Sequence, residues 1–482
     1  MDASKTLALL REYESRNVTF LEPDGSWPIV WERAKGVHVW DADGQKYLDL
    51  TGAFGVAATG HANPRVVAAG QRQMSRLLHA MGDVHPHALK ARLARELSRI
   101  TFERWEGKYE ARSTKSEGHG QGAACARGKT IFCNSGFEAV EAALKTAMLA
   151  TGKPGVIAFE GAYHGLGYGA LNVTQRAHFR SPFRRQLREF ACFAPFPQIN
   201  EPLRVVGQAS RLSPARLDAP NRTGGTPAPL AEATDTPKPL ELSIRRLFRR
   251  QRIGAVLVEP IQVRGGMRIP PPPFLPMLRQ LCDEHQALLI VDEVYTGFGR
   301  TGQWFACEHS GTVPDLICLG KALTGGFPLS ACVGRADLMD AAWPPSSGEA
   351  IHTSTFLGHP VGCAMALAEI HEIEARALVR RSAALGKLLL SRLTVLDPGR
   401  AALQLGARGV GLLAGLEVRL TDGSPATTAV LQIVKRLLRR GFILLPEGEH
   451  SNVIGFTPPL TISARQLRVA VNALGEELQR AL

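Results

Sequence analysis

The chain has 482 residues, 45% of them hydrophobic and 21% charged, which is the balance of a globular protein with room for two or three structural units. Its longest apolar runs, such as residues 287–291, are far too short to cross a bilayer, so we expect no membrane partner. The net charge of +13 is compatible with nucleic-acid binding, but the arginine-rich stretches 176–188 and 204–252 contain no recognisable nucleic-acid module. We therefore expect a solvated basic face and no nucleic-acid partner.

The N-terminus and the cysteines indicate in which cellular compartment we expect the protein. The first residues carry mixed charge and lack the pattern of a signal peptide. The eight cysteines are scattered and none forms a Cys-x-x-Cys pair, which indicates neither a zinc site nor a disulfide framework. We expect a reduced, cytoplasmic setting and no bound metal.

Along the chain, short apolar runs alternate with helical patterns, which favours an α/β fold with a mostly parallel sheet covered on both faces. Two segments without apolar periodicity, 106–129 and 204–239, are expected to be loop insertions. Helices are predicted at 137–150 and 274–285. The predicted strands are 130–133, 155–159, 254–258, 287–291, 316–319 and 331–334.

Chemically distinctive residues follow these predicted strands, at the edge where ligands bind in such sheets. Ser135 and Gly136 open a predicted helix, where free N–H groups attract a phosphate; a simple N-cap is the equal alternative for Ser135. Tyr163 follows the next strand and could stack on a flat cofactor or pack in the core. Gln262 lies just after 254–258 and could donate to a phenolate oxygen.

Asp292 and Lys321 form the most informative pair. Asp292 follows the run 287–291 directly, where a strand-end turn or a structural ion pair is the plain alternative. Lys321 is the only lysine between Lys238 and Lys387, and it lies in an apolar stretch flanked by glycine. An acid and an amine so placed could bracket a pyridine ring, the acid holding the ring nitrogen protonated and the lysine forming a Schiff base with an aldehyde.

These residues resemble the class III pyridoxal-phosphate aminotransferases, a family with the fold-type I architecture. The resemblance covers nearly the whole chain and is strongest over residues 259–334, which include the runs 289–294, 297–302 and 320–323. It implies a large domain with a mostly parallel seven-stranded sheet and a smaller α+β domain built from both chain ends. The expected bounds are 1–62 for the N-terminal part of the small domain, 63–345 for the large pyridoxal-phosphate domain and 346–482 for the C-terminal small domain.

The resemblance also assigns roles within the site. Lys321 matches the Schiff-base lysine and proton carrier, and Asp292 the partner of the pyridinium nitrogen. Val294 and Tyr163 match the residues on the two faces of the ring. The remaining cofactor-binding residues expected are Ser135, Gly136, Phe137, His164, Glu259, Gln262 and Thr355, with Thr355 reaching the phosphate of the neighbouring subunit. This implies a homodimer with shared active sites.

Five positions depart from the family pattern; Tyr295 and His359 are two of them, and the other three concern the substrate. Many relatives have Arg where Leu166 and Gly455 stand here, and Glu where Arg264 stands. In those relatives the glutamate and the second arginine form a switchable salt bridge. We expect Arg264 to bind a substrate carboxylate from the other wall of the pocket, with Phe54 as a further substrate contact. The alternative is that Arg264 points to solvent and the pocket prefers an apolar amine.

The expected function is transfer of an amino group from an amino acid or amine to a 2-oxo acid by a ping-pong mechanism. Two rivals stay open at this point. The first is another fold-type I reaction, such as that of an aminomutase, decarboxylase, racemase or phospho-lyase. The second is a non-catalytic paralogue that binds the cofactor. The identities of donor and acceptor do not follow from the sequence.

Overall fold

The computed structural model describes residues 2–22, 25–106, 127–199, 204–205, 238–399 and 401–480. Most of both predicted insertions, residues 107–126 and 206–237, lies outside the described residues. Their edges differ from the prediction, because β4 already begins at Gly128, residues 204–205 form a short strand and a helix begins at Lys238.

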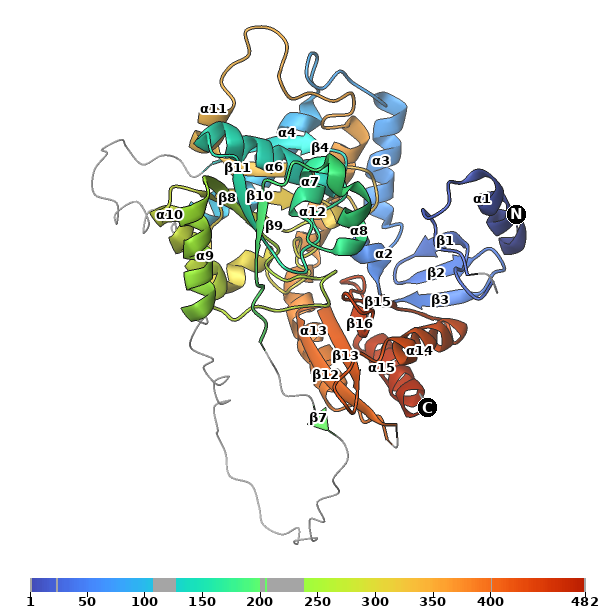
Figure 1. The fold of residues 1–482 in the computed structure, drawn as a ribbon. Coiled ribbons are helices and arrows are strands. Elements are labelled where there is room, and N and C mark those ends of the chain that lie inside the picture. The colour runs from blue at the N-terminus through green and yellow to red at the C-terminus, as the bar shows by residue number, and fades with distance from the viewer. Residues whose placement is uncertain are drawn as a thin grey trace, which may run out of the picture.

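The centre is a seven-stranded sheet in the order β4-β11-β10-β9-β8-β5-β6 (Figure 1). All six predicted strands are present, with shifts of at most two residues at their ends. β6 was missed, and β11 runs antiparallel to both of its neighbours, so the sheet is mostly parallel as expected. The strands are β4 (Gly128–Cys133), β5 (Gly155–Phe159), β6 (Ala191–Ala194), β8 (Ile253–Val258), β9 (Leu288–Asp292), β10 (Leu316–Leu319) and β11 (Ser330–Arg335).

Alternate side chains of these strands enter two separate cores, which is why the sheet is covered on both faces. In β8, for example, Ala255 and Leu257 face one core and Val256 and Val258 the other. The first core contains α6 (Gly136–Thr151), α7 (Tyr168–Val173) and α11 (Ala336–Ala342). The second core contains α4 (Ala88–Ile100), α9 (Lys238–Arg250), α10 (Phe274–Glu284) and α12 (Pro360–Ala375).

Both ends of the chain build the remaining structure, and Figure 1 shows them on the same side of the molecule. One sheet has the order β1-β2-β3-β14, in which β14 from the C-terminal region pairs in parallel with β3. Its strands are β1 (Trp31–Lys35), β2 (His38–Asp41), β3 (Lys46–Asp49) and β14 (Phe442–Ile443). This pairing agrees with a small domain made from both chain ends, while the three domain bounds themselves stay predictions.

A five-stranded sheet of order β15-β16-β13-β12-β7 completes the C-terminal part. Its strands are β7 (Arg204–Val205), β12 (Leu403–Val410), β13 (Leu413–Leu420), β15 (Leu445–Glu447) and β16 (Val453–Phe456).

The other helices are α1 (Ala3–Tyr13), α2 (Gly52–Gly55), α3 (Pro64–Arg76), α8 (Ala177–Arg180), α13 (Leu378–Thr394), α14 (Thr427–Arg439) and α15 (Ala464–Gln479). The 3-10 turns are η1 (Glu103–Trp105), η2 (Ser181–Gln186), η3 (Ala306–Ser310) and η4 (Lys321–Leu323). Among the described helices, none is long and apolar enough to cross a membrane.

Helix α13 packs closely on the turn between β12 and β13 through Gly386. A Cβ atom at position 386 would lie 2.1 Å from the carbonyl oxygen of Gly411, which is backbone and cannot swing aside. We expect Gly386→Ala to lower the free energy of unfolding by about 2 kcal/mol, because overpacking outweighs the better helix propensity of alanine. Urea unfolding measures this. The control is Gly475→Ala in α15, whose nearest obstacle is the end of the Leu396 side chain; equal midpoints for the two variants would contradict the expectation.

Candidate functional site

The carboxyl ends of five strands bring the predicted residues to one edge of the sheet. Ser135 follows β4, Tyr163 follows β5, Glu259 follows β8, Asp292 ends β9 and Lys321 follows β10. A cavity of about 430 Å³ lies there. Its lining includes Gly136, Phe137, Tyr163, His164, Glu259, Ile261, Arg264, Asp292, Val294, Tyr295 and Lys321.

Lys321 opens the short turn η4 with a backbone φ of 39°, in the left-handed region that a non-glycine residue rarely adopts. Its Nζ atom lies 4.4 Å from the centroid of the Tyr295 ring. Burial lowers the pKa of the Lys321 amine, and the nearby carboxylates of Asp292 and Glu259 oppose that shift. A lowered pKa increases the share of neutral amine, which is the nucleophilic form.

Asp292 is held in place from two sides. Its Oδ2 atom lies 2.8 Å from Nδ1 of His164, and its Oδ1 atom accepts a hydrogen bond of 3.1 Å from the backbone N–H of Val294. The Nε2 atom of His164 is buried without a hydrogen-bond partner among the described residues. The carboxylate therefore has a fixed orientation in the cavity wall, with His164 behind it.

The neighbouring acid, Glu293, has a different place. Its Oε1 atom accepts a hydrogen bond of 2.8 Å from the backbone N–H of Cys307, and its Oε2 atom accepts one of 2.5 Å from the Thr296 hydroxyl. Because successive side chains of a strand point to opposite faces, only one of the two adjacent acids can face the cavity. The lining contains Asp292 and not Glu293.

The N-terminus of α6 forms the other end of the cavity. The Glu138 side chain accepts hydrogen bonds from the backbone N–H groups of Asn134, at 2.6 Å, and Ser135, at 3.2 Å. The Ser135 hydroxyl is buried and has no hydrogen-bond partner among the described residues. A Cβ atom at Gly136 would lie 2.9 Å from Cγ1 of Val294, so the helix start and the residue after Asp292 are in close contact. Among the described residues, the Ser135 hydroxyl is therefore a free donor at the start of a 16-residue helix, where an anion is favoured.

Besides Ser135, which directly precedes the lining residue Gly136, three of the predicted residues are not in this lining. Gln262 is fully buried, and its Nε2 atom donates a hydrogen bond of 2.9 Å to the carbonyl of Glu160. Thr355 is exposed in a turn before α12. Phe54 is half-exposed in α2, where its φ is 60°. It is next to Gly55, whose missing Cβ would lie 2.8 Å from the Tyr295 ring. The roles predicted for the three stay predictions.

Arg264 forms an ion pair that the sequence did not indicate. Its Nη1 atom lies 2.8 Å from Oε2 of Glu447, the last residue of β15. Arg264 is 29% exposed and Glu447 only 4%. A second arginine, Arg176, is close enough to Arg264 for each charge to affect the other, and burial is the main cause that lowers the pKa of Arg176. Both Glu447 and Arg176 were missed.

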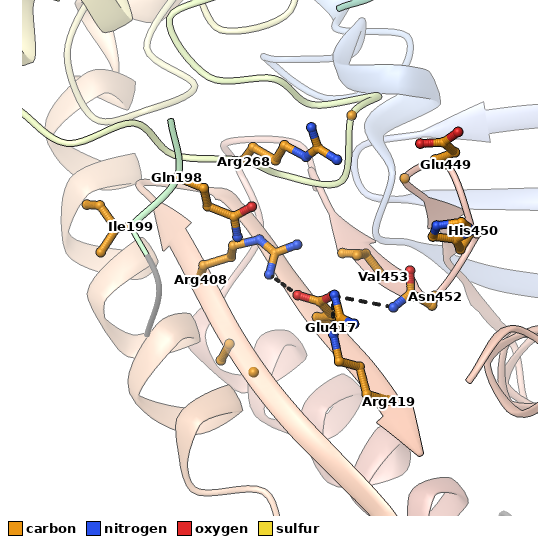
Figure 2. Close-up of a pocket in the computed structure, with 14 residues that line it drawn as sticks. Gln198, Ile199, Arg268, Arg408, Glu417, Arg419, Glu449, His450, Asn452 and Val453 are labelled. Atoms are coloured by element: carbon orange, nitrogen blue, oxygen red, sulfur yellow. Dashed lines mark hydrogen bonds and ion pairs between the residues drawn. The ribbon is translucent and has the colours of Figure 1, made fainter. Parts of the chain in front are cut away.

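A second cavity of about 330 Å³ is lined by Gly265 and Gly448, which follow the two members of this ion pair. Figure 2 shows that Arg408 and Arg419 both reach Glu417 there. The N–O distances are 2.6 Å from Arg408 and 2.7 Å from Arg419. Because both arginines share one carboxylate, these three side chains together keep one positive charge.

Glu259 makes the stability of the site depend on pH. Its Oε1 atom accepts a hydrogen bond of 2.9 Å from the backbone N–H of Tyr163, and burial raises the pKa of its carboxyl to about 7 from 4.5. A raised pKa means that Glu259 favours folding at low pH and that this contribution is lost as the pH rises through about 7. As the pH rises from about 5 to about 8, the free energy of unfolding of the wild type should fall by about 3 kcal/mol relative to that of Glu259→Gln.

Urea unfolding of the cofactor-free protein over that pH range measures the difference. The glutamine can still accept the hydrogen bond from Tyr163, so the two proteins differ mainly in the titrating group. Glu293, whose carboxyl pKa burial also raises to about 7, stays present in both and cancels. If the free energy of unfolding changed with pH by the same amount in wild type and variant, the burial of an ionisable acid at this position would be contradicted.

The sequence matches the family model for class III aminotransferases over residues 21–478. It is 35% identical to the 5-aminovalerate aminotransferase DavT of Pseudomonas aeruginosa, over 93% of both chains, and 32% identical to the 4-aminobutyrate aminotransferase GabT of Escherichia coli, also over 93% of both. The putrescine aminotransferase of Pectobacterium atrosepticum is 34% identical over 96% of this chain and 86% of that protein. An (S)-enantioselective omega-transaminase from Thermomicrobium roseum has a similar fold, with a TM-score of 0.81, 24% identity and 100% and 99% of the two chains covered.

Proposed function

Because the chain belongs to the class III aminotransferases, it is an enzyme that transfers an amino group to a 2-oxo acid, and we propose that it holds pyridoxal phosphate in the cavity beside Lys321. The observation that carries the proposal is the placement of Lys321 and Asp292. They follow and end two adjacent parallel strands, β10 and β9, and both line the same cavity. An amine and a fixed carboxylate on one cavity wall match the two ends of a pyridine ring that carries an aldehyde.

Other residues in and beside the cavity fit the same group. The buried hydroxyl of Ser135 lacks a partner among the described residues and stands at a helix N-terminus, where a phosphate would be stabilised. His164 keeps Asp292 oriented, as a contact with a protonated ring nitrogen requires. Tyr163 and Val294 line the cavity from the ends of different strands, as residues on the two faces of a flat ring would.

The bound cofactor would supply an electron sink for the pair of electrons left when the substrate's α-proton is removed. This chain would supply the rest. Lys321 would hold the aldehyde through its amine and, once the donor has displaced it, move the proton at the substrate carbon. Asp292 would keep the ring nitrogen protonated throughout. The donor leaves as a carbonyl product before the 2-oxo acid enters, which gives two half-reactions with ping-pong kinetics.

For the donor, we propose a primary amine at the end of an unbranched chain. The relatives named for 5-aminovalerate, 4-aminobutyrate and putrescine act on such amines, and Leu166 replaces an arginine with a side chain that is apolar and 48% exposed. We further propose a homodimer in which Thr355, exposed in this chain, reaches the phosphate of the neighbouring site. A reduced, cytoplasmic setting is supported by the cysteines, since those described are all free thiols.

Absorbance spectroscopy of the cofactor-loaded protein tests the proposal. Each donor in a panel of amino acids, ω-amino acids and amines is added alone, and then 2-oxoglutarate is added. The visible absorbance of the bound cofactor should fall with terminal amines and return with 2-oxoglutarate. A spectrum that no member of the panel changes would contradict the proposed donor class.

A further inference from the structure

The ion pair between Arg264 and Glu447 stands beside the reacting amine. Arg264 lines the cavity that contains Lys321. Glu447 and Lys321 each act on the other's pKa, the carboxylate raising that of the amine and the amine lowering that of the carboxyl. Arg264 therefore lies in the cavity wall, and Glu447, which is not in the lining, is joined to this wall by the ion pair.

Glu447 is an unusual partner for a residue of this wall because it is only 4% exposed. Burial raises the pKa of its carboxyl, and Arg264 and Arg176 oppose that shift. Arg264 is the better-exposed partner at 29%, so it can turn toward solvent or toward a ligand while Glu447 stays in place. A buried carboxylate that loses its arginine needs another cation at once.

Gly455 makes room for the Glu447 side chain. Strands β15 and β16 pair so that Glu447 is opposite Val453 and Leu445 is opposite Gly455. A Cβ atom at position 455 would lie 3.0 Å from Cγ of Glu447 and 3.1 Å from Cε of Met267. A larger residue would push the carboxylate away from Arg264. The glycine and the glutamate thus form one local arrangement that keeps an acid in the wall.

We propose that Glu447 binds the distal ammonium of a diamine donor and that Arg264, with Arg176, binds the distal carboxylate of a dicarboxylic 2-oxo acid acceptor. This rests on the proposed function, because it assigns the two substrate tails of the two half-reactions. With no ligand the Arg264–Glu447 pair neutralises itself. A cationic tail replaces Arg264 on Glu447, while the better-exposed Arg264 turns toward solvent. An anionic tail adds a second carboxylate beside Arg264 and Arg176, whose charges both act on Glu447, so that two arginines face two carboxylates.

Pairs of ligands that share the reacting group and differ in the distal charged group measure the contribution of that distal group. Cadaverine and pentylamine share the reacting amine, but only cadaverine has a distal ammonium. 2-Oxoglutarate and pyruvate differ in the same way in the distal carboxylate. Rates of each half-reaction are measured by absorbance of the bound cofactor in wild type, Glu447→Gln and Arg264→Gln. Glu477→Gln is the control, since Glu477 is 1% exposed and paired with three arginines, Arg436, Arg440 and Arg480, none of which lines the cavity.

We expect Glu447→Gln to lower kcat/KM for cadaverine by about 10-fold or more, with pentylamine changed by less than about 3-fold. Arg264→Gln should lower kcat/KM for 2-oxoglutarate by about 10-fold while pyruvate changes little. In the control variant, the ratio of kcat/KM for cadaverine to that for pentylamine, and the ratio for 2-oxoglutarate to pyruvate, should both keep the wild-type value. Equal changes for cadaverine and pentylamine in Glu447→Gln, or wild type that reacts with other donors but not with cadaverine, would overturn the inference and leave the aminotransferase function standing.

Calorimetry with glutarate, a dicarboxylate that cannot react, tests the pair without turnover. Glu447→Gln should bind glutarate several-fold more tightly, because Arg264 is then free, and Arg264→Gln should bind it about 10-fold more weakly. Unchanged affinity in both variants would overturn the exchange of partners. If no donor reacts with wild type at all, the proposed function fails, and this measurement still decides whether the ion pair opens for an anion.

Discussion

Replacing Lys321 by arginine is expected to lower aminotransferase turnover by about 10⁴-fold or more, although the positive charge is kept. The guanidinium is protonated at every relevant pH and cannot act as a nucleophilic amine or carry a proton to and from carbon. The burial that lowers the pKa of Lys321 has no comparable effect on an arginine's chemistry. Steady-state rates at saturating donor and 2-oxoglutarate measure the loss.

A control shows that the loss is chemical. Lys153→Arg changes another half-buried lysine, whose Nζ atom donates to the carbonyls of His285 and Gln286 at 2.9 and 3.0 Å. Arginine can make similar bonds there, so this variant should keep nearly all activity. Lys321→Ala should be as inactive as Lys321→Arg, because neither has the amine. Substantial turnover in either Lys321 variant would contradict the assignment of Lys321 as the reacting amine.

Replacing Asp292 by asparagine is expected to lower the rate of the donor half-reaction by about 10³-fold, the order of magnitude for removing one fixed electrostatic group from a reaction centre. Asparagine fits the same space but carries no charge to hold a proton on the ring nitrogen. It also gives His164 a weaker partner at 2.8 Å. Single-turnover absorbance changes with one donor measure the half-reaction directly.

His164→Gln separates the two parts of this effect. It leaves the Asp292 charge in place and removes only the imidazole that orients it. We expect a loss of about 10-fold, well short of the loss in Asp292→Asn. If His164→Gln and Asp292→Asn were equally slow, the role of Asp292 would be orientation of the local structure and not its charge.

The meeting of the site residues at the strand ends could be predicted from the sequence. Asp292 and Lys321 follow strongly apolar runs, and parallel strands end at one edge of a sheet, so their meeting follows from the α/β pattern. The direction of β11 was not predictable in this way, because an apolar run of residues 331–334 reads the same in a parallel or an antiparallel strand. β6 was missed because only Ala194 of its four residues is fully buried.

The substrate wall was only partly predictable. Arg264 was identified through its departure from the family pattern, but its partner Glu447 lies 183 residues away on a strand of three residues. No periodicity marks such a residue. Its position depends on the pairing of β15 with β16 and on the space that Gly455 leaves, both of which are tertiary features. For this reason the sequence indicated the cofactor more clearly than the substrate.

Reductive trapping identifies the residue that holds the cofactor. The protein loaded with pyridoxal phosphate is reduced with borohydride, which fixes an aldehyde permanently to the amine that holds it, and is then digested and mapped by mass spectrometry. We predict that the cofactor's mass is found on the peptide containing Lys321 and that adding an amine donor before reduction prevents the labelling. Labelling of a different lysine, or of none, would contradict the assignment of this cavity as the aminotransferase site.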